Sequence, residues 1–489
     1  MNPKELIQHY SQPLKMFRSS PNIKFEGPPQ VVRKEIQYSS LFIHQQDVQS
    51  VDSVRIGIVF SGGPASGGHD VLCGILDQLR SGDQLIGFCG GPKGLLKGDS
   101  KLISISDMAQ ISCTGGFDFL GTDRTKISTP EQFEQVRFQV KKHHLTALII
   151  VGGDDSNTNA LYLADALYGD CLVIGIPKTI DGDLRMSPYL PISFGFHSAT
   201  QHYATLINQL IIDANATSKY WHVIKLMGRH ASHVTLEVCL QSHPNACVLS
   251  EEILDYEWSL NDLIDYFSTV ILERHDQGMP FGTIVFPEGI LDVIPEFKAL
   301  IDGDVGPIND VLESYGVIPI RPIDVQHDSH GNANFSTIQV ESMILDLVKA
   351  DVSKVLGDKS SVKFIEHFFG YSGRGVPPTE FDTHYSRLLG KTAYELVLSN
   401  LTGVLAAVGY LDGEVSVSGV PLYSMLSLDK ERHQYVIQKK LVDVMADDFQ
   451  QYQSQKVLWR NQPQTFVRKV PVDVPLILEI GITNAKKEN

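Results

Sequence analysis

The sequence predicts an α/β protein built on parallel β-sheets, and the clearest sign is the stretch from Thr146 to Asp183. An apolar run, Leu148 to Val151, stops at a pair of glycines and is followed by apolar residues at helical spacing. This pattern is typical of a buried parallel strand, a glycine turn and a helix N-terminus. A second buried strand, Cys171 to Ile176, follows. Both strands should end at the same carboxyl edge of one sheet, where open α/β sheets bind ligands.

The loops that follow these two strands suit phosphate chemistry. They read Gly152-Gly153-Asp154-Asp155-Ser156-Asn157 and Pro177-Lys178-Thr179-Ile180-Asp181-Gly182-Asp183. Glycines let the backbone approach an anion, and the N–H groups of a helix N-terminus favour negative charge. Because Asp154 and Asp155 would repel a bare phosphate, we expect a Mg²⁺ ion between them and the ligand. An ordinary turn with an Asp or Ser cap is the alternative for the first loop alone, and the second carboxylate loop favours the phosphate site.

Length and composition set the outer limits. A chain of 489 residues is too long for one typical core, so two or three domains are expected. The 57 acidic residues outnumber the 41 basic ones and give a net charge of −16. This argues against general binding of nucleic acid or anionic membranes, because both depend on positive surface. A polyanionic substrate would have to be held by local basic residues and metal.

Targeting signals and cysteine pairs are both missing from the sequence. No apolar run approaches the ~20 residues of a membrane span, and Met1 to Ser50 shows no signal-peptide segment, so we expect a cytoplasmic protein. The cysteines lack any CxxC pair, fall mostly in apolar patterns, and are expected to be reduced, buried and inert. They are Cys73, Cys89, Cys113, Cys171, Cys239 and Cys247.

A second glycine-rich loop follows the first strand of the chain. The strand begins near Val54 and ends in Ser61-Gly62-Gly63-Pro64-Ala65-Ser66-Gly67-Gly68, with a helix from about Asp70. The loop lacks the Lys-Ser/Thr ending of a Walker A motif. Taken alone, it is equally compatible with a structural turn and with a phosphate cradle.

Apolar patterns place further elements along the chain. They predict helices from Thr129-Pro130, over Ser198 to about Ala216, from Thr337 to about Lys349 and over Glu431 to Tyr452, and strands over Tyr220–Leu226, Phe281–Phe286 and Val362–Phe368. His230 and His233 could ligate a metal, but no partner ligands follow at useful spacing. Helix-cap or surface roles are therefore favoured for both histidines.

Four motifs carry a resemblance to a known family. They are GGDDSNTNA from Gly152, PKTIDGDL from Pro177, MGR at Met227 to Arg229 and GYSGRG at Gly370 to Gly375. With these motifs in this order, the chain from about Val54 to about Leu401 resembles the pyrophosphate-dependent 6-phosphofructokinases of the long bacterial and plant-like type.

The resemblance implies two Rossmann-like parallel-sheet domains with the active site in the cleft between them, plus N- and C-terminal extensions. The expected division is an N-terminal arm (1–50), a phosphoryl-donor domain (51–192, completed by about 373–430), a fructose 6-phosphate domain (193–372, with an insertion near 302–334) and a C-terminal helical extension (431–489). The implied reaction moves a phosphoryl group from pyrophosphate to the 1-hydroxyl of fructose 6-phosphate, reversibly. An ATP-dependent 6-phosphofructokinase is one alternative. A non-catalytic regulatory subunit is the other, although it predicts loss of residues that are present here, Asp181 and Arg229.

Roles for single residues also follow from the resemblance. Asp181 would be the general base, Asp154 would hold Mg²⁺, and Arg229 and Lys178 would balance charge on the moving phosphoryl group. Asp155 is also expected among the catalytic residues. The implied substrate-binding residues are Thr179, Ile180, Asp181, Lys219, Tyr220, Met227, Gly228, Arg229, Glu288, Tyr371 and Arg374, and the implied donor-binding residues are Gly63, Arg124 and Lys178.

Some of these roles have plain alternatives. Arg124, with Lys126 behind it, could be a solvated loop cation, and the family usually has glycine where this chain has Asp123. Glu288 could simply interact with a helix dipole. Tyr371 stands where many ATP-using relatives have histidine, yet its hydroxyl can still donate one hydrogen bond.

Two pairs of residues predict, by the same resemblance, the oligomeric state and the choice of phosphoryl donor. Lys219-Tyr220 matches a pair that reaches the substrate phosphate across a subunit interface in relatives, so a homodimer is expected. Asp155 and Lys178 occupy positions that are typically glycine in ATP-using relatives. Asp155 would fill the space of the nucleotide and repel its α-phosphate, whereas Lys178 can reach a short donor, so pyrophosphate should be preferred.

Overall fold

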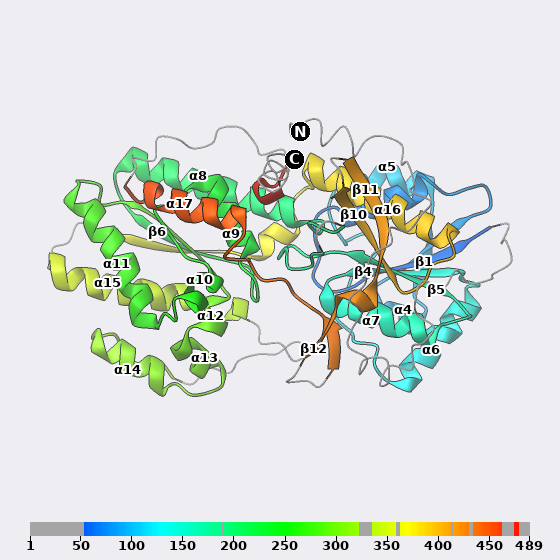
Figure 1. Ribbon diagram of the computed structural model, residues 1–489, viewed down its shortest axis with the longest axis horizontal. Coiled ribbons are helices and arrows are strands. Elements are labelled where there is room, and N and C mark those ends of the chain that lie inside the picture. Colours follow the sequence, from blue (N-terminus) through cyan, green and yellow to red (C-terminus); the bar gives the residue numbers. More distant parts are fainter. Residues whose placement is uncertain are drawn as a thin grey trace. The chain divides into compact units, whose positions relative to one another are not determined.

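The computed structural model describes residues 53–186, 189–321, 335–357, 362–411, 414–429, 434–461 and 474–478. They fall into two compact units. Unit 1 comprises the described residues up to Ser198 together with Arg374–Lys439, and unit 2 comprises Ala199–Gly373 with the described residues from Lys440 onward. Each unit contains a sheet with parallel strands and helices on both sides (Figure 1). The predicted α/β class is confirmed, whereas the arm at 1–50 and residues 322–334 of the expected insertion lie outside the described residues.

Unit 1 is built on a seven-stranded sheet in the order β11-β10-β5-β4-β1-β2-β3. The five strands from β10 to β2 are parallel, while β11 and β3 run antiparallel at the two edges. The central strands are apolar along their whole length because both faces of the sheet are covered. The strands are β1 (Arg55–Phe60), β2 (Gln84–Phe88), β3 (Ser100–Ile103), β4 (Ala147–Gly152), β5 (Leu172–Pro177), β10 (Val404–Leu411) and β11 (Glu414–Pro421).

Helices cover both faces of this sheet. Figure 1 shows α4, α6 and α7 on one face and α5 with α16 on the other, and α3 packs against α16. These elements are α3 (Gly68–Leu76), α4 (Gly91–Lys97), α5 (Ile105–Ile111), α6 (Pro130–Lys142), α7 (Asp154–Ala166), α16 (Glu380–Leu398) and the short 3₁₀ turn η3 (Leu422–Met425). The strands and helices predicted from the loops at Ser61, Gly152 and Pro177 are confirmed.

The helix predicted over Glu431–Tyr452 is wrong for its described residues before Asp447. β13 (Gln434–Ile437) pairs with β12 (Leu426–Asp429) as an antiparallel ribbon in unit 1, and helix α17 (Asp447–Asn461) begins only later. The apolar side chains counted toward a helical stripe do not share one environment, because Val442 is buried whereas Met445 is 79% exposed.

Unit 2 has a smaller, fully parallel sheet in the order β7-β8-β6-β9. Helices α8, α9 and α17 lie on one face and α10 to α15 on the other, where α11 and α15 contribute more core residues than the other helices (Figure 1). The strands are β6 (Trp221–Leu226), β7 (Ala246–Cys247), β8 (Gly282–Pro287) and β9 (Phe364–Phe369), and the helices are α9 (His233–Ser242), α10 (Ser250–Asp255), α11 (Leu260–Asp276), α12 (Ile290–Val293), α13 (Pro295–Ile301), α14 (Gly306–Ser314) and α15 (Val340–Leu356), with the 3₁₀ turn η1 (Phe335–Thr337). The division between the units falls inside α8 (Phe196–Thr217) and at the end of the 3₁₀ turn η2 (Tyr371–Arg374).

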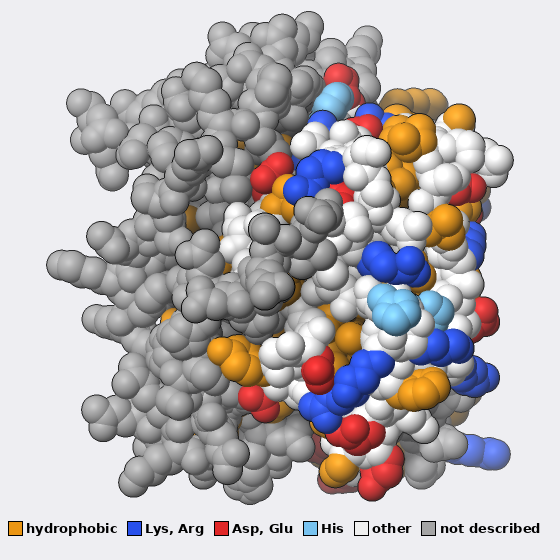
Figure 2. Space-filling view, turned by 90° about the vertical axis from the view of Figure 1, so that its right-hand side faces the viewer, with side chains coloured by type: hydrophobic (Ala, Val, Ile, Leu, Met, Phe, Trp, Pro, Cys, Tyr) orange, Lys and Arg blue, Asp and Glu red, His pale blue; other side chains and the backbone are white. Residues whose placement is uncertain are grey.

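On the face shown in Figure 2, basic side chains are interspersed with acidic, histidine and apolar ones. In the described part of the chain, no helix is both long and apolar enough to cross a bilayer.

All six cysteines are free, and four are buried as predicted, but Cys113 is exposed. It follows α5 in a left-handed turn with φ 56°, which an apolar sequence pattern does not reveal.

Candidate active site

Three loops meet at the carboxyl edge of the unit 1 sheet, because β5, β4 and β1 are neighbours and parallel. Hydrogen bonds join each loop to the next. Lys178 N donates to Gly152 O (2.9 Å) and Ser61 N donates to Val151 O (2.8 Å). The hydroxyl of Ser156 donates to that of Ser61 (2.8 Å) and connects the two glycine-rich turns. The sequence therefore predicted correctly that these loops share one edge.

Glycines in the loop after β1 leave room for cations that come from elsewhere in the chain. Gly62 has φ 85°, and a Cβ there would lie 3.5 Å from Lys178 Nζ. A Cβ at Gly63 would lie 3.3 Å from the guanidinium carbon of Arg374. Two cationic side chains thus lie beside these glycines. This arrangement can hold a phosphate.

Lys178 is almost fully buried, with 7% of its surface exposed. Burial and the positive charges of Arg374 and Arg124 lower its pKa to about 8, although Asp181 and Asp154 favour its charged form. Its ammonium also lies 5.9 Å from the ring centroid of Phe117. A buried ammonium next to a second cation is destabilised until an anion binds, which is a physical reason to assign it to an anionic ligand.

A group of carboxylates lies beside these cations. Asp183 is 5% exposed, and burial together with the negative charges of Asp181 and Asp154 raises its pKa to about 7. No group of three or more His, Cys, Asp or Glu side chains among the described residues is arranged to hold a metal by itself. Mg²⁺ needs only one or two carboxylates when phosphate oxygens complete its shell. Asp154 with Asp181 and Asp183 nearby therefore fits such an ion, which would relieve their mutual repulsion.

The loop after β5 is fixed around Asp181. Its N–H donates to the hydroxyl of Thr179 (3.0 Å), and the Ser193 hydroxyl donates to Thr179 O (2.9 Å). Gly182 follows with φ 71°, and a Cβ there would lie 2.7 Å from the ring of Phe196. Thr179 and Ile180 are buried, whereas Asp181 is half-buried and accessible.

The neighbours of Arg124 hold it near the Gly62-Gly63 loop. Gly62 N donates to Asp123 O (2.9 Å), and the hydroxyl of Thr122 donates to Gly62 O (2.8 Å). The exposed Arg124 side chain contributes to the lowered pKa of Lys178. The loop therefore keeps these contacts with Gly62 although Asp123 stands where the family usually has glycine. Lys126 is half-buried, and Asp155 lies in the first turn of α7, half-buried.

One residue of this site was missed by the sequence analysis. Lys439 follows β13, and its Nζ lies 3.2 Å from Asp154 Oδ2. The signal was the short run Tyr435-Val436-Ile437 of aromatic and β-branched residues, which favours a strand rather than the predicted helix.

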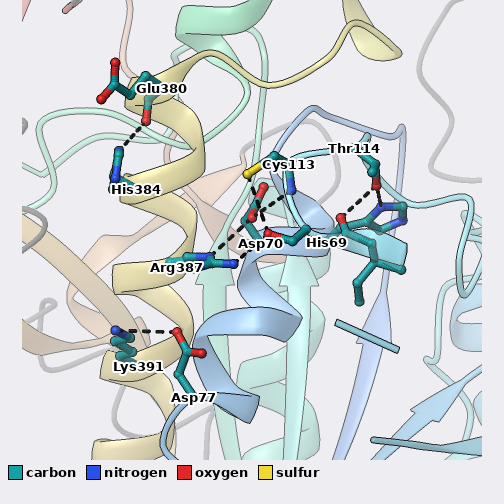
Figure 3. A network of polar contacts seen from close by, with 11 residues as sticks. His69, Asp70, Asp77, Cys113, Thr114, Glu380, His384, Arg387 and Lys391 are labelled. Atoms are coloured by element: carbon teal, nitrogen blue, oxygen red, sulfur yellow. Dashed lines mark hydrogen bonds and ion pairs between the residues drawn. The ribbon is translucent and has the colours of Figure 1, made fainter. Parts of the chain in front are cut away.

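A polar network fixes α3, the helix that follows the Gly62-Gly63 loop, against α16. Arg387 Nε lies 3.4 Å from Asp70 Oδ1, which also accepts from Cys113 N at 3.2 Å (Figure 3). Lys391 Nζ lies 3.6 Å from Asp77 Oδ2 further along the same two helices. The network holds the end of the loop in place.

In unit 2, the predicted sugar-binding residues also gather at one sheet edge. Met227-Gly228-Arg229 follow β6, and Glu288 follows the neighbouring strand β8. Glu288 N donates to Leu226 O (2.8 Å) and Gly289 N donates to Gly228 O (3.1 Å), so the two loops are joined. Gly228 has φ 125°, which a larger residue rarely adopts.

The 3₁₀ turn η1, which precedes α15, supplies two further side chains that contact these residues. The hydroxyl of Ser336 donates to Glu288 Oε2 (3.2 Å), and the Arg229 guanidinium lies 5.8 Å from the ring centroid of Phe335. Ser336 was not found from the sequence, since nothing there marks it. Arg229 Nε donates to His230 Nε2 (2.7 Å), whereas His233 Nε2 donates to Lys440 O (2.9 Å), so the two histidines do not converge on a metal.

Two predicted site residues lie elsewhere in unit 2. Lys219 and Tyr220 come directly before β6, at the amino edge of the sheet, while Arg229 follows the same strand. The six residues of β6 span roughly 20 Å. Tyr371 follows β9 at the carboxyl edge and is 54% exposed. The structure therefore separates Lys219 and Tyr220 from Arg229 within one chain.

Comparisons with known proteins place this geometry in a family. The family model described as Phosphofructokinase matches residues 55–397. The chain is 36% identical over 490 residues to pyrophosphate–fructose 6-phosphate 1-phosphotransferase subunit beta 2 of Arabidopsis thaliana, covering 92% of this chain and 86% of that protein. It is 37% identical over 449 residues to the pyrophosphate–fructose 6-phosphate 1-phosphotransferase of Entamoeba histolytica, covering 83% and 81%.

A solved structure supports the fold. The structure described as pyrophosphate-dependent phosphofructokinase from Nitrosospira multiformis superposes with a TM-score of 0.58 at 16% identity, covering 86% of this chain and 96% of that chain. On the match of the family model and the identity to these relatives, the chain belongs to the phosphofructokinase family.

Proposed function

We propose that this chain is an enzyme that transfers a phosphoryl group from pyrophosphate to the 1-hydroxyl of fructose 6-phosphate, giving fructose 1,6-bisphosphate and phosphate in a reversible reaction. The observation that carries the proposal is the buried Lys178 beside Arg374, facing the Gly62-Gly63 loop. Two cations over a glycine loop suit a short, highly charged donor that brings no nucleoside to bind. The names of the relatives at 36% and 37% identity support the same donor and acceptor.

Roles in the transfer follow from charge and position. Asp181, held by Thr179 and accessible, takes the proton of the attacking 1-hydroxyl as general base. Lys178 and Arg229 balance the charge of the moving phosphoryl group, and Arg124 and Gly63 bind the donor. Arg374, which we assign to the 6-phosphate, lies close enough to Gly63 to contact a donor phosphate as well.

A magnesium ion fits the carboxylate group of unit 1. Asp154 would hold it, with oxygens of the donor completing its shell. When bound, the ion supplies positive charge to the donor phosphates. Asp155 would not bind the ion but would restrict the donor to pyrophosphate.

Most residues that we assign to the acceptor lie in unit 2. Met227, Gly228, Arg229 and Glu288 would contact the sugar, with Thr179, Ile180 and Tyr371 as further contacts. Since Lys219 and Tyr220 lie at the opposite sheet edge from Arg229, their phosphate contact would serve a second copy of the chain. Tyr220 also has φ 70°, an uncommon conformation of the kind found at functional positions. We therefore propose a homodimer, and a cytoplasmic location.

Initial rates on the purified chain test the proposal. Fructose 1,6-bisphosphate formation is coupled to aldolase, with pyrophosphate or ATP as donor at matched free Mg²⁺. We expect kcat/KM for pyrophosphate to exceed that for ATP about a hundredfold, from charge repulsion at Asp155. Equal use of ATP would support an ATP-dependent kinase, and no activity with either donor would support a non-catalytic subunit.

The pH dependence of pyrophosphate use should report on Lys178. Its pKa is lowered to about 8, so the free enzyme loses this cation as the pH rises through that value. Only the ammonium form attracts phosphate, and kcat/KM for pyrophosphate should therefore fall above about pH 8. In Lys178→Arg the side chain stays charged, and the fall should move to higher pH.

The comparison between the two proteins removes the ionisation of pyrophosphate itself, which is the same in both assays. Profiles of kcat/KM against pH from 6 to 10 provide the measurement. Identical alkaline limbs in the two proteins would show that Lys178 does not titrate in this range.

A further inference from the structure

Lys439 lies in a contact with α7 that is more regular than a chance surface pair. Its Nζ is 3.2 Å from Asp154 Oδ2, and the two side chains are only 25% and 24% exposed. Two residues earlier, Ile437 N donates to the Thr158 hydroxyl (2.9 Å). Two residues before that, Tyr435 O accepts from the Tyr162 hydroxyl (3.3 Å).

These three contacts form a register between a strand and a helix. On the strand side the positions are two residues apart, 435, 437 and 439. On the helix side they are four apart, 162, 158 and 154. Two strand residues rise by roughly 6.6 Å and four helical residues by roughly 6 Å, so successive contacts match. The buried Ile437 anchors this run in the same core as α7.

This register places the ammonium group of Lys439 at the first turn of α7. Lys439 reaches Asp154, the residue to which we assign the metal, and its charge partly opposes the rise in the pKa of the neighbouring Asp183. Two other cations of the site, Lys178 and Arg374, face the Gly62-Gly63 loop. Lys439 contacts the carboxylate side of the site directly.

We propose that Lys439 is a donor-binding residue that acts as the counter-ion of Asp154 until the metal-bound donor arrives. The inference rests on the proposed function. Without donor, the ammonium neutralises Asp154 at the place where a divalent cation would bind. With the metal–pyrophosphate complex bound, the same ammonium is repelled by the metal and contacts an oxygen of the donor, whose net charge is still negative.

Two effects of opposite sign distinguish this role from simple support of the β12–β13 ribbon. Loss of the Lys439 charge should strengthen binding of a free divalent cation, because a competitor for Asp154 is removed. The same loss should weaken binding of pyrophosphate, because a cation that contacts it is removed. A residue that only holds the ribbon in place would weaken both or neither.

The test compares Lys439→Gln and Lys439→Arg with Lys141→Gln in the full chain. Lys141 is exposed in the last turn of α6, which leads into the amino end of β4, and its substitution matches the charge change. Binding of Mn²⁺ alone is measured by titration calorimetry without donor. KM for pyrophosphate and for fructose 6-phosphate are then measured at saturating Mg²⁺, and thermal unfolding confirms that each variant is folded.

We expect Lys439→Gln to bind Mn²⁺ more tightly, by roughly 1.4-fold to fivefold, the range for a partly exposed ion pair. Its KM for pyrophosphate should rise about tenfold, the effect of losing one charged hydrogen bond, while KM for fructose 6-phosphate stays unchanged. Lys439→Arg should restore most of the pyrophosphate affinity, and Lys141→Gln should match the parent.

Weaker or unchanged Mn²⁺ binding in Lys439→Gln would overturn the inference, as would an unchanged KM for pyrophosphate. Absence of Mn²⁺ binding in the parent would overturn it too. If the parent binds Mn²⁺ but turns over no pyrophosphate, the proposed function fails first. The calorimetric comparison then still decides whether Lys439 is the counter-ion of Asp154.

Discussion

Replacing Asp181 with Ser is expected to lower kcat at least about a hundredfold, the usual cost of a lost general base. The backbone that carries Asp181 is held by Thr179 on one side and by Gly182, packed at Phe196, on the other. These contacts fix the position of the base. KM for pyrophosphate should change little, because the proton is transferred only in the reaction step.

Asp181→Asn is the sharper companion, since the amide keeps the size and some hydrogen bonds of the carboxylate but cannot accept the proton. It should lose as much activity as the serine variant. Asp302→Asn, at an exposed position after α13, controls for the change of charge. Turnover within threefold of the parent in either Asp181 variant would mean that the base is another residue.

The double variant Asp155→Gly with Lys178→Gly should raise ATP-dependent kcat/KM at least tenfold while pyrophosphate use collapses. Asp155 places a carboxylate in the first turn of α7, at the edge where the donor loops meet. Like charges ~5 Å apart repel by roughly 3 kcal/mol at an effective dielectric constant near 20, or about two decades in affinity. Removing Lys178 vacates the space beside Gly62 and also removes a cation that the short donor needs.

The single variants separate these two effects. Asp155→Gly alone should admit ATP only in part, because Lys178 still occupies the neighbouring space. Lys178→Gly alone should lose pyrophosphate activity without gaining ATP activity. Initial rates with both donors at matched free Mg²⁺ provide the measurement. If the double variant retained full pyrophosphate activity and gained nothing with ATP, these residues would not set the choice of donor.

The sequence was informative where a site residue follows a strand of a parallel sheet. Buried parallel strands are recognisable as apolar runs, and the residues after them must meet at one edge. This logic located Asp154, Lys178 and Asp181 in unit 1, and Arg229 and Glu288 in unit 2. The family resemblance supplied their roles.

The logic fails for residues that reach the site from outside the sheet edge. Arg374 lies beside Gly63 although more than 300 residues separate them, and no local pattern encodes such a contact. Lys439 was missed because five apolar residues from Val436 to Phe449 suggested a helix. Helical spacing in a short window cannot exclude a hairpin, since the competing contacts, from Thr158 and Tyr162 of α7, lie elsewhere in the chain.

Asp183, buried next to two other carboxylates, has a consequence for the evolution of this protein. A carboxylate in this place weakens the resting fold, because burial and the charges of Asp181 and Asp154 disfavour its ionised form. Selection for heat resistance alone would therefore favour a neutral residue such as asparagine at this position. If natural variants retain the aspartate, they do so against that pressure, and its retention can be read as a record of selection for ligand binding.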